Sequence, residues 1–263
     1  MRYLLAALLI YSASVLPAEA ASSPDAIAYD YKSINAQYEI QPDSSIKVEE
    51  RITIAFEGTF HSLWRGVSLG PVAVSNVEVI DADTGEALKF VAQFPDLPNA
   101  PENFGTYAWI NDNGYFKVQW HYSAADTTKT WVLRYTLRGA VAFLKDHDEF
   151  EWSLFSRYAV PVASTTVRVV LPAPAAITGE LTSATGTVAS QEGEVVMRAG
   201  VVPAGGGVAF VARWPKGILH PPVHAFFLTE MALTYGLWVL MAPVLVLLIL
   251  GGGGYWLYKK RTQ

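Results

Sequence analysis

Cysteine is absent from the 263 residues of this sequence, and its absence removes several classes of protein. A disulfide framework, a zinc site with cysteine ligands, an iron–sulfur cluster and a thiol nucleophile all need this residue. Charged residues are scarce as well, at 16% of the chain against about 25% in an ordinary soluble domain. The deficit is concentrated near the two ends, and the residues between them have the composition of a soluble domain.

The N-terminal segment has the three parts of a secretory signal peptide. Arg2 supplies the charge, an apolar run extends over 3–16, and Ala18-Glu19-Ala20 forms a small-x-small cleavage site. The apolar run is too short to cross about 30 Å of hydrocarbon at about 1.5 Å per residue. We therefore predict a signal peptide over residues 1–20 that is removed on export.

A long uncharged stretch near the C-terminus predicts one transmembrane helix over residues 231–258. Aromatic residues bracket it, and the basic cluster Lys259-Lys260-Arg261 follows in a tail over residues 259–263. The positive-inside rule places this tail in the cytoplasm, and the signal peptide places the middle of the chain outside. We expect a single-pass protein of the plasma membrane, bound to the lipid bilayer through this C-terminal helix, with residues 215–230 as a stalk.

The middle of the chain is acidic, with 15 basic and 23 acidic residues between positions 21 and 232. An acidic surface argues against nucleic acid as a partner. Its apolar residues alternate with a period of two, as in the series Ile46, Val48, Ile52, Ile54 and Phe56. At least ten such segments, separated by Gly, Asp, Asn and Pro turns, predict an all-β fold, an antiparallel β-sandwich.

The Leu171-Pro172-Ala173-Pro174 segment divides the predicted strands into two groups. Residues 21–172 form the main β-sandwich domain in this prediction. Residues 173–214 form either a β-rich extension of it or a second small β-domain.

The densest acidic cluster surrounds His147 and includes Asp148, Glu149 and Glu151. Several carboxylates together suit a calcium ion, and a carboxylate pair suits a glycosidase with Trp109, Trp120 and Trp152 stacked on sugars. The spacing fits no helical calcium loop, however, and Glu149 and Glu151 share one strand face opposite Phe150 and Trp152. A solvated strand edge is the simpler interpretation, and a surface that contacts a partner is the alternative.

Trp64 and Arg65 follow a strand and a tight turn. One interpretation is a core tryptophan beside an arginine that pairs with an acid such as Glu57. The other is an anchor for a binding partner, because tryptophan and arginine dominate interface hot spots. The first is the simpler, and the second makes Trp64 and Arg65 candidate partner-binding residues together with Asp148, Glu149 and Glu151.

Several segments in this order resemble the predicted bacterial membrane protein family known as domain of unknown function 2207. They are Asp43 to Glu50, Phe56-Glu57-Gly58, Trp64-Arg65, Trp131 to Gly139, Asp148 to Trp152, and Val167 to Pro172. The resemblance implies an extracytoplasmic β-rich domain tethered to a membrane, with no established activity. Proteins of this kind usually continue into further membrane helices and a cytoplasmic region, whereas this sequence stops at Gln263. We expect a short relative or a separated N-terminal half, so that any task of the further part is either absent here or supplied by another chain.

The sequence shows no Gly-x-Ser-x-Gly elbow and no glycine-rich phosphate loop, so we expect no enzyme, no cofactor and no metal. We expect a binding module of the cell envelope whose partner is a membrane or envelope protein. A glycan-active envelope enzyme and a structural spacer without a ligand are the alternatives.

Overall fold

The computed structural model describes residues 28–96, 99–112 and 114–220, and nearly all of its regular structure is β-strand. The prediction of an all-β fold is confirmed for these residues. The described residues contain one short 3₁₀ turn, Pro101–Asn103, and no helix with the length and apolar character to cross a bilayer. The predicted signal peptide, transmembrane helix and cytoplasmic tail lie outside the described residues.

The largest sheet has eight strands in the order β14-β15-β12-β1-β2-β9-β4-β5. These strands are β1 (Ala28–Ile40), β2 (Ile46–Glu57), β4 (Ala73–Asp81), β5 (Glu86–Ala87), β9 (Thr128–Arg138), β12 (Thr165–Val170), β14 (Gly186–Gln191) and β15 (Glu194–Ala199).

Two four-stranded sheets accompany it, in the orders β3-β8-β7-β6 and β10-β11-β16-β13. The first, which we call the β3 sheet, contains β3 (Thr59–Ser68), β6 (Lys89–Phe90), β7 (Thr106–Asp112) and β8 (Tyr115–Ala125). The second, the β11 sheet, contains β10 (Val141–Phe143), β11 (His147–Phe155), β13 (Thr178–Leu181) and β16 (Val208–Pro215).

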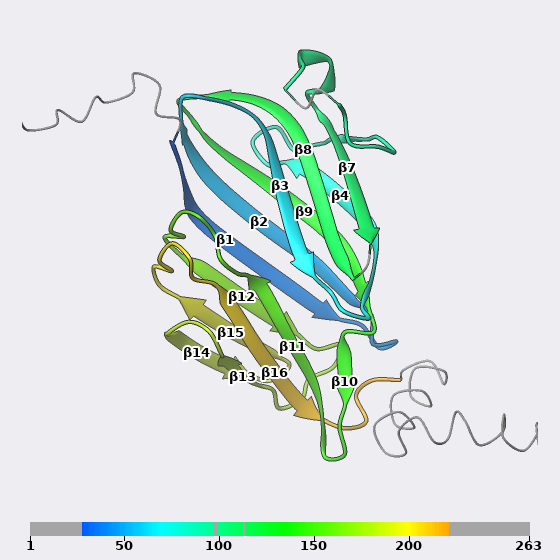
Figure 1. Ribbon diagram of the computed structural model, residues 1–263. Coiled ribbons are helices and arrows are strands. Elements are labelled where there is room, and N and C mark those ends of the chain that lie inside the picture. Colours follow the sequence, from blue (N-terminus) through cyan, green and yellow to red (C-terminus); the bar gives the residue numbers. More distant parts are fainter. Residues whose placement is uncertain (1–27, 97–98, 113, 221–263) are drawn as a thin grey trace, which may run out of the picture.

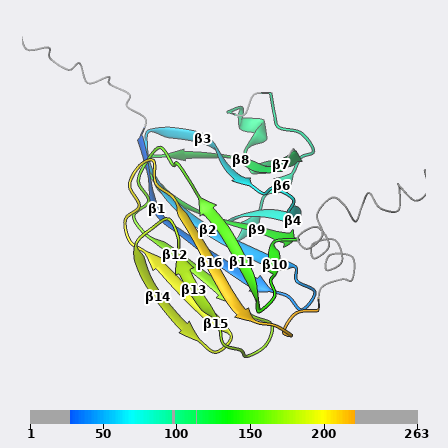
Figure 2. The ribbon, with the colours of Figure 1, turned by 60° about the horizontal axis from the view of Figure 1, so that its bottom comes forward.

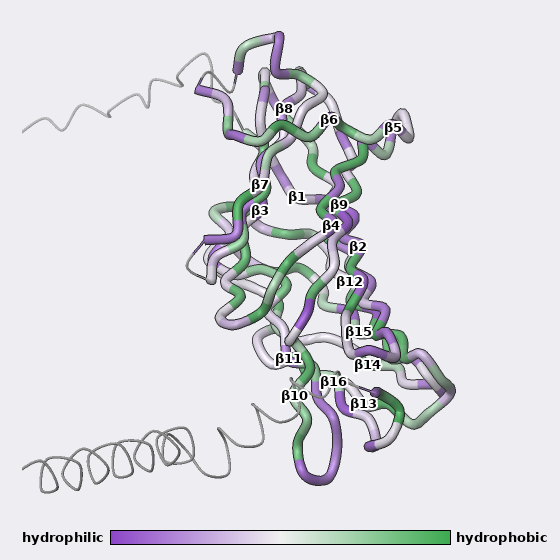
Figure 3. Tube along the Cα trace, turned by 90° about the vertical axis from the view of Figure 1, so that its right-hand side faces the viewer, coloured by the Kyte–Doolittle hydropathy of each residue, from purple (hydrophilic) through white to green (hydrophobic). Residues whose placement is uncertain are grey.

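The two small sheets lie side by side over one face of the large sheet (Figures 1 and 2). The edge-on view shows β2, β9, β12 and β15 along one side and β3, β7 and β11 along the other (Figure 3). Aromatic pairs join the layers, because Trp120 of β8 packs 5.9 Å from Trp131 of β9, and Tyr38 of β1 packs 5.3 Å from Phe150 of β11. The core is therefore continuous beneath both small sheets.

The strand alternation in β2 follows the predicted pattern closely. Ile46, Val48, Ile52, Ile54 and Phe56 are all buried on the inner face of the large sheet. The inner position between Val48 and Ile52 belongs to Glu50, which is also fully buried. A carboxylate on the core face requires a partner, and the partner defines the functional site described below.

Two parallel strand pairings depart from the predicted antiparallel architecture. β12 lies parallel to β1, with Ile34 opposite Thr165, and β6 lies parallel to β7. β1 and β12 are far apart in the chain. Between β2 and β12 the chain forms strands of both small sheets, and it also adds β4, β5 and β9 to the large sheet. A strand that returns after such a crossover is free to run in either direction, whereas a tight hairpin forces the antiparallel one.

Residues 173–214 share both layers with the rest of the domain. β15 pairs with β12 in the large sheet, and β16 pairs with β11 in the small one. The described part of the predicted stalk also contacts the domain, because Leu219 is buried and the His220 N–H donates to the Pro42 carbonyl at 2.7 Å. The chain therefore leaves the described region close to the β1–β2 turn.

Candidate functional site

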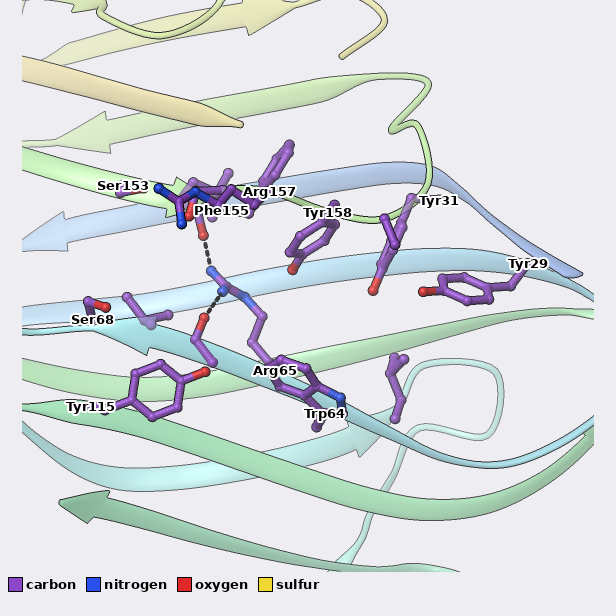
Figure 4. A pocket seen from close by; sticks show the side chains of 16 residues that line it. Tyr29, Tyr31, Trp64, Arg65, Ser68, Tyr115, Ser153, Phe155, Arg157 and Tyr158 are labelled. Carbon is purple, nitrogen blue, oxygen red and sulfur yellow. Dashed lines mark hydrogen bonds between the residues drawn. The ribbon is translucent and has the colours of Figure 1, made fainter. Parts of the chain in front are cut away.

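A cleft of about 350 Å³ lies where the β3 sheet meets the β11 sheet. One wall is β3 from Leu63 to Ser68 together with Tyr115, and the other is the chain from Ser153 to Ala159 as it leaves β11. Tyr29 and Tyr31, at the start of β1, complete the lining (Figure 4). The cleft thus uses residues from four strands, β1, β3, β8 and β11.

Arg65 lies beneath the cleft with its guanidinium buried against Glu50 of β2. Its Nε donates to Glu50 Oε2 at 2.9 Å and its Nη2 to Oε1 at 3.3 Å. The Tyr135 hydroxyl of β9 donates to the same Oε1 at 2.6 Å. Both charges are almost completely removed from water. The pair can therefore stabilise the fold only if these hydrogen bonds replace the lost hydration of both groups.

A bulge in β11 supplies a further acceptor for Arg65. The register of β11 against β16 shifts between Ser153 and Phe155, which leaves Leu154 as the extra residue. Arg65 Nη2 donates to the Leu154 carbonyl, and Nη1 donates to the Gly66 carbonyl at 2.7 Å. One guanidinium therefore joins the β3 sheet, the large sheet and the β11 sheet.

The protonation of this group of residues is strongly biased by its surroundings. Burial by itself lowers the pKa of Arg65, but the Glu50 carboxylate outweighs it and holds that pKa well above its ordinary value. Burial first, and then the charge of Glu50, raise the pKa of Tyr135 well above 10. Arg65 is therefore a permanent cation and Tyr135 a permanent hydrogen-bond donor at physiological pH.

Trp64 has the opposite orientation to Arg65, because successive side chains of a strand point to opposite faces. Its side chain is 56% exposed, the largest value among the aromatic residues exposed in the described structure. Lys117 Nζ of β8 lies 5.6 Å from the centre of its ring. Beside it, Gly66 leaves room for the Tyr115 hydroxyl, which lies where a β-carbon of residue 66 would be.

Tyrosine rings form the opposite side of the cleft. Tyr31 packs 4.8 Å from Tyr158, Tyr158 packs 4.8 Å from Phe155, and Tyr29 lies 5.9 Å from Tyr31 (Figure 4). Burial, followed by the neighbouring tyrosines, raises the pKa of Tyr31 far above its ordinary value. Burial raises the pKa of Tyr158 as well. The hydroxyls of Tyr31 and Tyr158 therefore stay neutral and act as hydrogen-bonding groups on an apolar wall.

The charged side chains that line the cleft are Arg65 and Arg157, and no described Asp or Glu is among the lining residues. Arg65 is neutralised by Glu50, whereas Arg157 is exposed. Arg157 has φ 55°, a left-handed conformation that holds it in the sharp turn after β11. The cleft thus carries a net positive charge on an acidic domain.

Two of the five predicted partner-binding residues, Trp64 and Arg65, lie at the cleft. The interpretation of Trp64 as a core residue is wrong, because it is exposed and Arg65 occupies the core position. The acid that pairs with Arg65 is Glu50 of β2 rather than Glu57. The parity of Leu63, Val67 and Leu69 is the signal for this orientation, since these apolar residues share the face of Arg65.

The other three predicted residues, Asp148, Glu149 and Glu151, lie on β11 away from the cleft lining. Asp148 is buried and accepts a hydrogen bond from Lys216 Nζ at 2.8 Å. Glu149 pairs with Arg213 of β16 at 2.6 Å, and Glu151 is exposed. In the described part of the chain, no three His, Asp or Glu side chains gather as metal ligands would.

The tryptophans proposed for sugar stacking are placed differently from that proposal. Trp120 and Trp152 are buried in the core, and Trp109 packs 6.1 Å from Phe116. They offer no open ring beside Glu149 and Glu151. Of the three exposed aromatic residues in the described structure, Trp64 and Tyr115 line the cleft, and Phe90 lies elsewhere.

Glu50 and the tyrosines are site residues that the sequence pattern did not single out. The interruption of an apolar period-two series at Glu50 was a usable signal, because a charge on a core face is almost always paired. The tyrosines had no such signal, since their meeting depends on how the sheets pack.

Comparison with solved structures gives distant likenesses. A putative protease from Parabacteroides distasonis aligns with a TM-score of 0.35 and 14% identity, over 72% of this chain and 40% of that protein. An M1 zinc metallopeptidase from Deinococcus radiodurans aligns with a TM-score of 0.40 and 13% identity, over 70% of this chain and 42% of that protein. The chain thus spans less than half the length of these proteins.

No curated protein matches the sequence. A family model does match, over residues 30–214, which include all but a few of the described residues. Its description is the N-terminal domain of a predicted membrane protein, domain of unknown function 2207. The chain belongs to this family.

Proposed function

We propose that this protein is a membrane-tethered, extracytoplasmic binding module of the bacterial cell envelope. Its partner is another membrane or envelope protein, and the cleft beside β3 is the contact site. The observation that carries the proposal is Trp64, an exposed tryptophan at the mouth of a cleft whose other wall is built from tyrosines.

The exposed Trp64 side chain supports a binding function, because contact between an apolar ring and water is unfavourable. A tryptophan that is more than half exposed keeps a large apolar area in water, which a partner can cover. Tryptophan, tyrosine and arginine are also the residues that dominate binding energy in measured interfaces. All three types meet at this cleft.

The rigidity of the cleft floor is a second support. Arg65 is held by Glu50, by the Gly66 carbonyl and by the Leu154 carbonyl, so the two walls are fixed relative to each other. A preformed site loses little conformational entropy when a partner binds. The buried ion pair therefore holds the cleft in one shape.

The chemistry of the lining favours binding over hydrolysis. A glycosidase needs two carboxyl groups facing an open groove, and the described residues place no Asp or Glu in the cleft wall. The tether and the orientation follow from the predicted signal peptide, the predicted transmembrane helix and the basic tail.

A crosslinking experiment tests the proposal. Full-length protein carrying an affinity tag is crosslinked in intact cells and isolated as wild type, as Trp64→Ala and as Phe90→Ala. Phe90 is a matched control because it is 49% exposed and belongs to the same sheet, at its far edge. We expect one envelope protein to be trapped by wild type and Phe90→Ala and to be lost with Trp64→Ala.

Other results contradict the proposal. Equal trapping by all three proteins would remove the cleft as the site. A wild-type protein that trapped only itself, or nothing, would remove the binding function.

A further inference from the structure

We infer that the partner enters the cleft as an extended polypeptide segment that carries an acidic side chain and adds as a strand to the open edge of β3. This inference rests on the proposed function and specifies the chemical class and the geometry of the ligand. Strand addition joins main-chain hydrogen bonds, which supply affinity, to side-chain contacts, which supply specificity.

The first observation is the edge of β3 itself. β3 has ten residues and pairs with β8 on one side, and no other described strand pairs with it. The cleft runs along the unpaired side, because consecutive residues from Leu63 to Ser68 line it. An unpaired strand edge of this length is a template for another strand.

The direction of the backbone groups follows from the ladder with β8. The Leu69 N–H donates to the Gly114 carbonyl at 2.7 Å, beyond the last residue of β3. Since alternate residues of an antiparallel strand bond to the same neighbour, Trp64, Gly66 and Ser68 direct their N–H and C=O groups away from β8. The Gly66 carbonyl agrees with this phase, because it accepts a hydrogen bond from the guanidinium of the adjacent Arg65 on the side away from β8.

The second observation is the arrangement of side chains beside this edge. Gly66 has no side chain of its own, and the Tyr115 hydroxyl packs against it between the side chains of Trp64 and Ser68. An added strand would point alternate side chains to opposite faces. One set would meet Trp64 and Tyr115, and the other would meet the tyrosine wall that includes Tyr31 and Tyr158.

The third observation is charge. The unneutralised cation of the cleft is Arg157, and Lys117 lies beside Trp64. No described carboxylate lines the cleft, and Arg65 neutralises Glu50 beneath it, so an acidic side chain of the ligand would meet a net attraction. A sugar would find hydroxyl groups and arginine but no carboxylate or amide side chain in the lining, which favours a peptide over a glycan.

The other unpaired edges of the described structure differ from β3. β5, β6 and β10 are two or three residues long, and β13 carries Glu180 close to Arg213. β14 is six residues long and exposed throughout, but no aromatic residue belongs to it. Short strands and charges protect an edge from unwanted pairing. β14 therefore supplies a control edge.

The experiment uses the full-length protein in lipid nanodiscs and random phage-displayed peptides of ten residues, the length of β3. We expect the selected peptides to share an acidic residue and alternating apolar positions. The tightest peptide is then synthesised with single N-methyl groups along its backbone. N-methylation at every second position should weaken binding at least about tenfold, and at the intervening positions less than about twofold.

Protein variants give the matched comparison. Arg157→Asn, which suits the left-handed backbone, should weaken the acidic peptide and leave its amide analogue unchanged. Val188→Pro on β14 should leave the affinity of both peptides unchanged. Trp64→Ala should weaken both.

The possible failures are distinct. If Trp64→Ala abolishes peptide binding but N-methylation has no alternating effect, strand addition is wrong and the proposed function survives. If the selection yields no peptide, or a panel of envelope oligosaccharides binds in its place, the inference is overturned. If the selected peptide is indifferent to Trp64→Ala, the proposed site falls with the inference.

Discussion

Two ion pairs of the molecule differ in how far they are removed from water. Beneath the cleft, Arg65 and Glu50 are both removed from water, at 2% and 0% exposure of their side chains. On β11 and β16, Glu149 pairs with Arg213, with side chains 17% and 41% exposed. The first pair fixes the layers of the fold to one another, whereas the second joins two neighbouring strands at the surface.

The two pairs should differ in how much stability is lost when one member is removed. Arg65 has acceptors on β2, on β3 and on the bulge of β11, so its loss would leave several buried groups unsatisfied. Arg213 has water available whenever its partner is removed. A buried pair is therefore costly to break singly even though an apolar replacement of both members can be tolerated.

The largest expected effect follows from breaking the buried pair. Glu50→Ala or Arg65→Met alone should lower the free energy of unfolding by about 3–5 kcal/mol, because each leaves an uncompensated buried charge. The measurement is denaturant unfolding of the full-length protein in detergent, followed by tryptophan fluorescence. Glu50→Leu combined with Arg65→Met should recover most of the loss.

A single variant that cost less than about 1 kcal/mol would contradict this assignment, since such a value is typical of an exposed pair. A double variant no more stable than the singles would show that the hydrogen bonds to Gly66 and Leu154 matter more than the pair itself.

Replacing Asp148 should lower the stability by an amount between those for the buried Arg65–Glu50 pair and the exposed Arg213–Glu149 pair. Its carboxylate is buried, but its partner Lys216 has a side chain that is 38% exposed. Asp148→Asn should lower the free energy of unfolding by about 1.5–3 kcal/mol, the value of a hydrogen bond to a charged group. The same unfolding experiment measures it, and Glu151→Gln, an exposed carboxylate on the same strand, is the control.

The pH dependence of stability should come from the partly exposed carboxylates. Burial raises the pKa of Asp81, but the hydrogen bond from Lys129 and the backbone outweigh it, and the pKa is lowered below 3.8 in the folded state. Hydrogen bonds from Ser45 lower the pKa of Asp43 in the same direction. Their stabilisation is present above the unfolded pKa and is lost as the pH falls through the lower, folded pKa.

We therefore expect the free energy of unfolding to fall between pH 4 and the folded pKa values, by less than about 1 kcal/mol for each group. Asp81→Asn should flatten the curve in this range, measured by unfolding at a series of pH values. A curve that kept its full slope in Asp81→Asn and Asp43→Asn would assign the acid sensitivity to other carboxylates.

The exposed pair should give a small effect. Glu149→Gln or Arg213→Gln should lower the free energy of unfolding by about 0.2–1 kcal/mol, and about 0.5 M salt should reduce the difference from wild type. The thermal midpoints of the two variants with and without salt measure it. A loss as large as that of Glu50→Ala would remove the distinction between the two pairs.

Trp64 should give the smallest effect on stability, although it should have the largest effect on binding. Trp64→Ala should change the free energy of unfolding by less than about 0.5 kcal/mol, because the ring is mostly in water. Trp120→Ala, at a fully buried position, is the contrast and should cost about 3–5 kcal/mol. A severe loss in Trp64→Ala would restore the interpretation of this tryptophan as a core residue.

The sequence predicts the strands well because a buried face imposes the period of two. The alternation from Ile46 to Phe56 is observed, and its interruption marks Glu50. It predicts the layers less well, because the parallel pairing of β1 with β12 depends on a crossover between sheets. The bulge at Leu154, which carries one of the acceptors for Arg65, has no local sequence signal.

In the candidate site, the residues that are neighbours in the sequence are predictable, and those that meet only through packing are not. Trp64 and Arg65 are adjacent residues with contrasting surroundings, so the parity of the flanking leucines and valine decides which is buried. Tyr31 and Tyr158 are far apart in the chain and meet through packing alone. Asp148 and Glu149 stood out as a cluster in the sequence, but a strand separates their side chains onto two faces.

Site-specific photocrosslinking in intact cells tests the central claim most directly. A photoreactive amino acid is placed in the full-length protein at Ser68 and Arg157, which line the cleft, and at Glu151 and Val188, which are exposed away from it. We predict that Ser68 and Arg157 capture the same envelope protein and that Glu151 and Val188 do not. Capture from Glu151 or Val188 with no capture from the cleft positions would contradict the account.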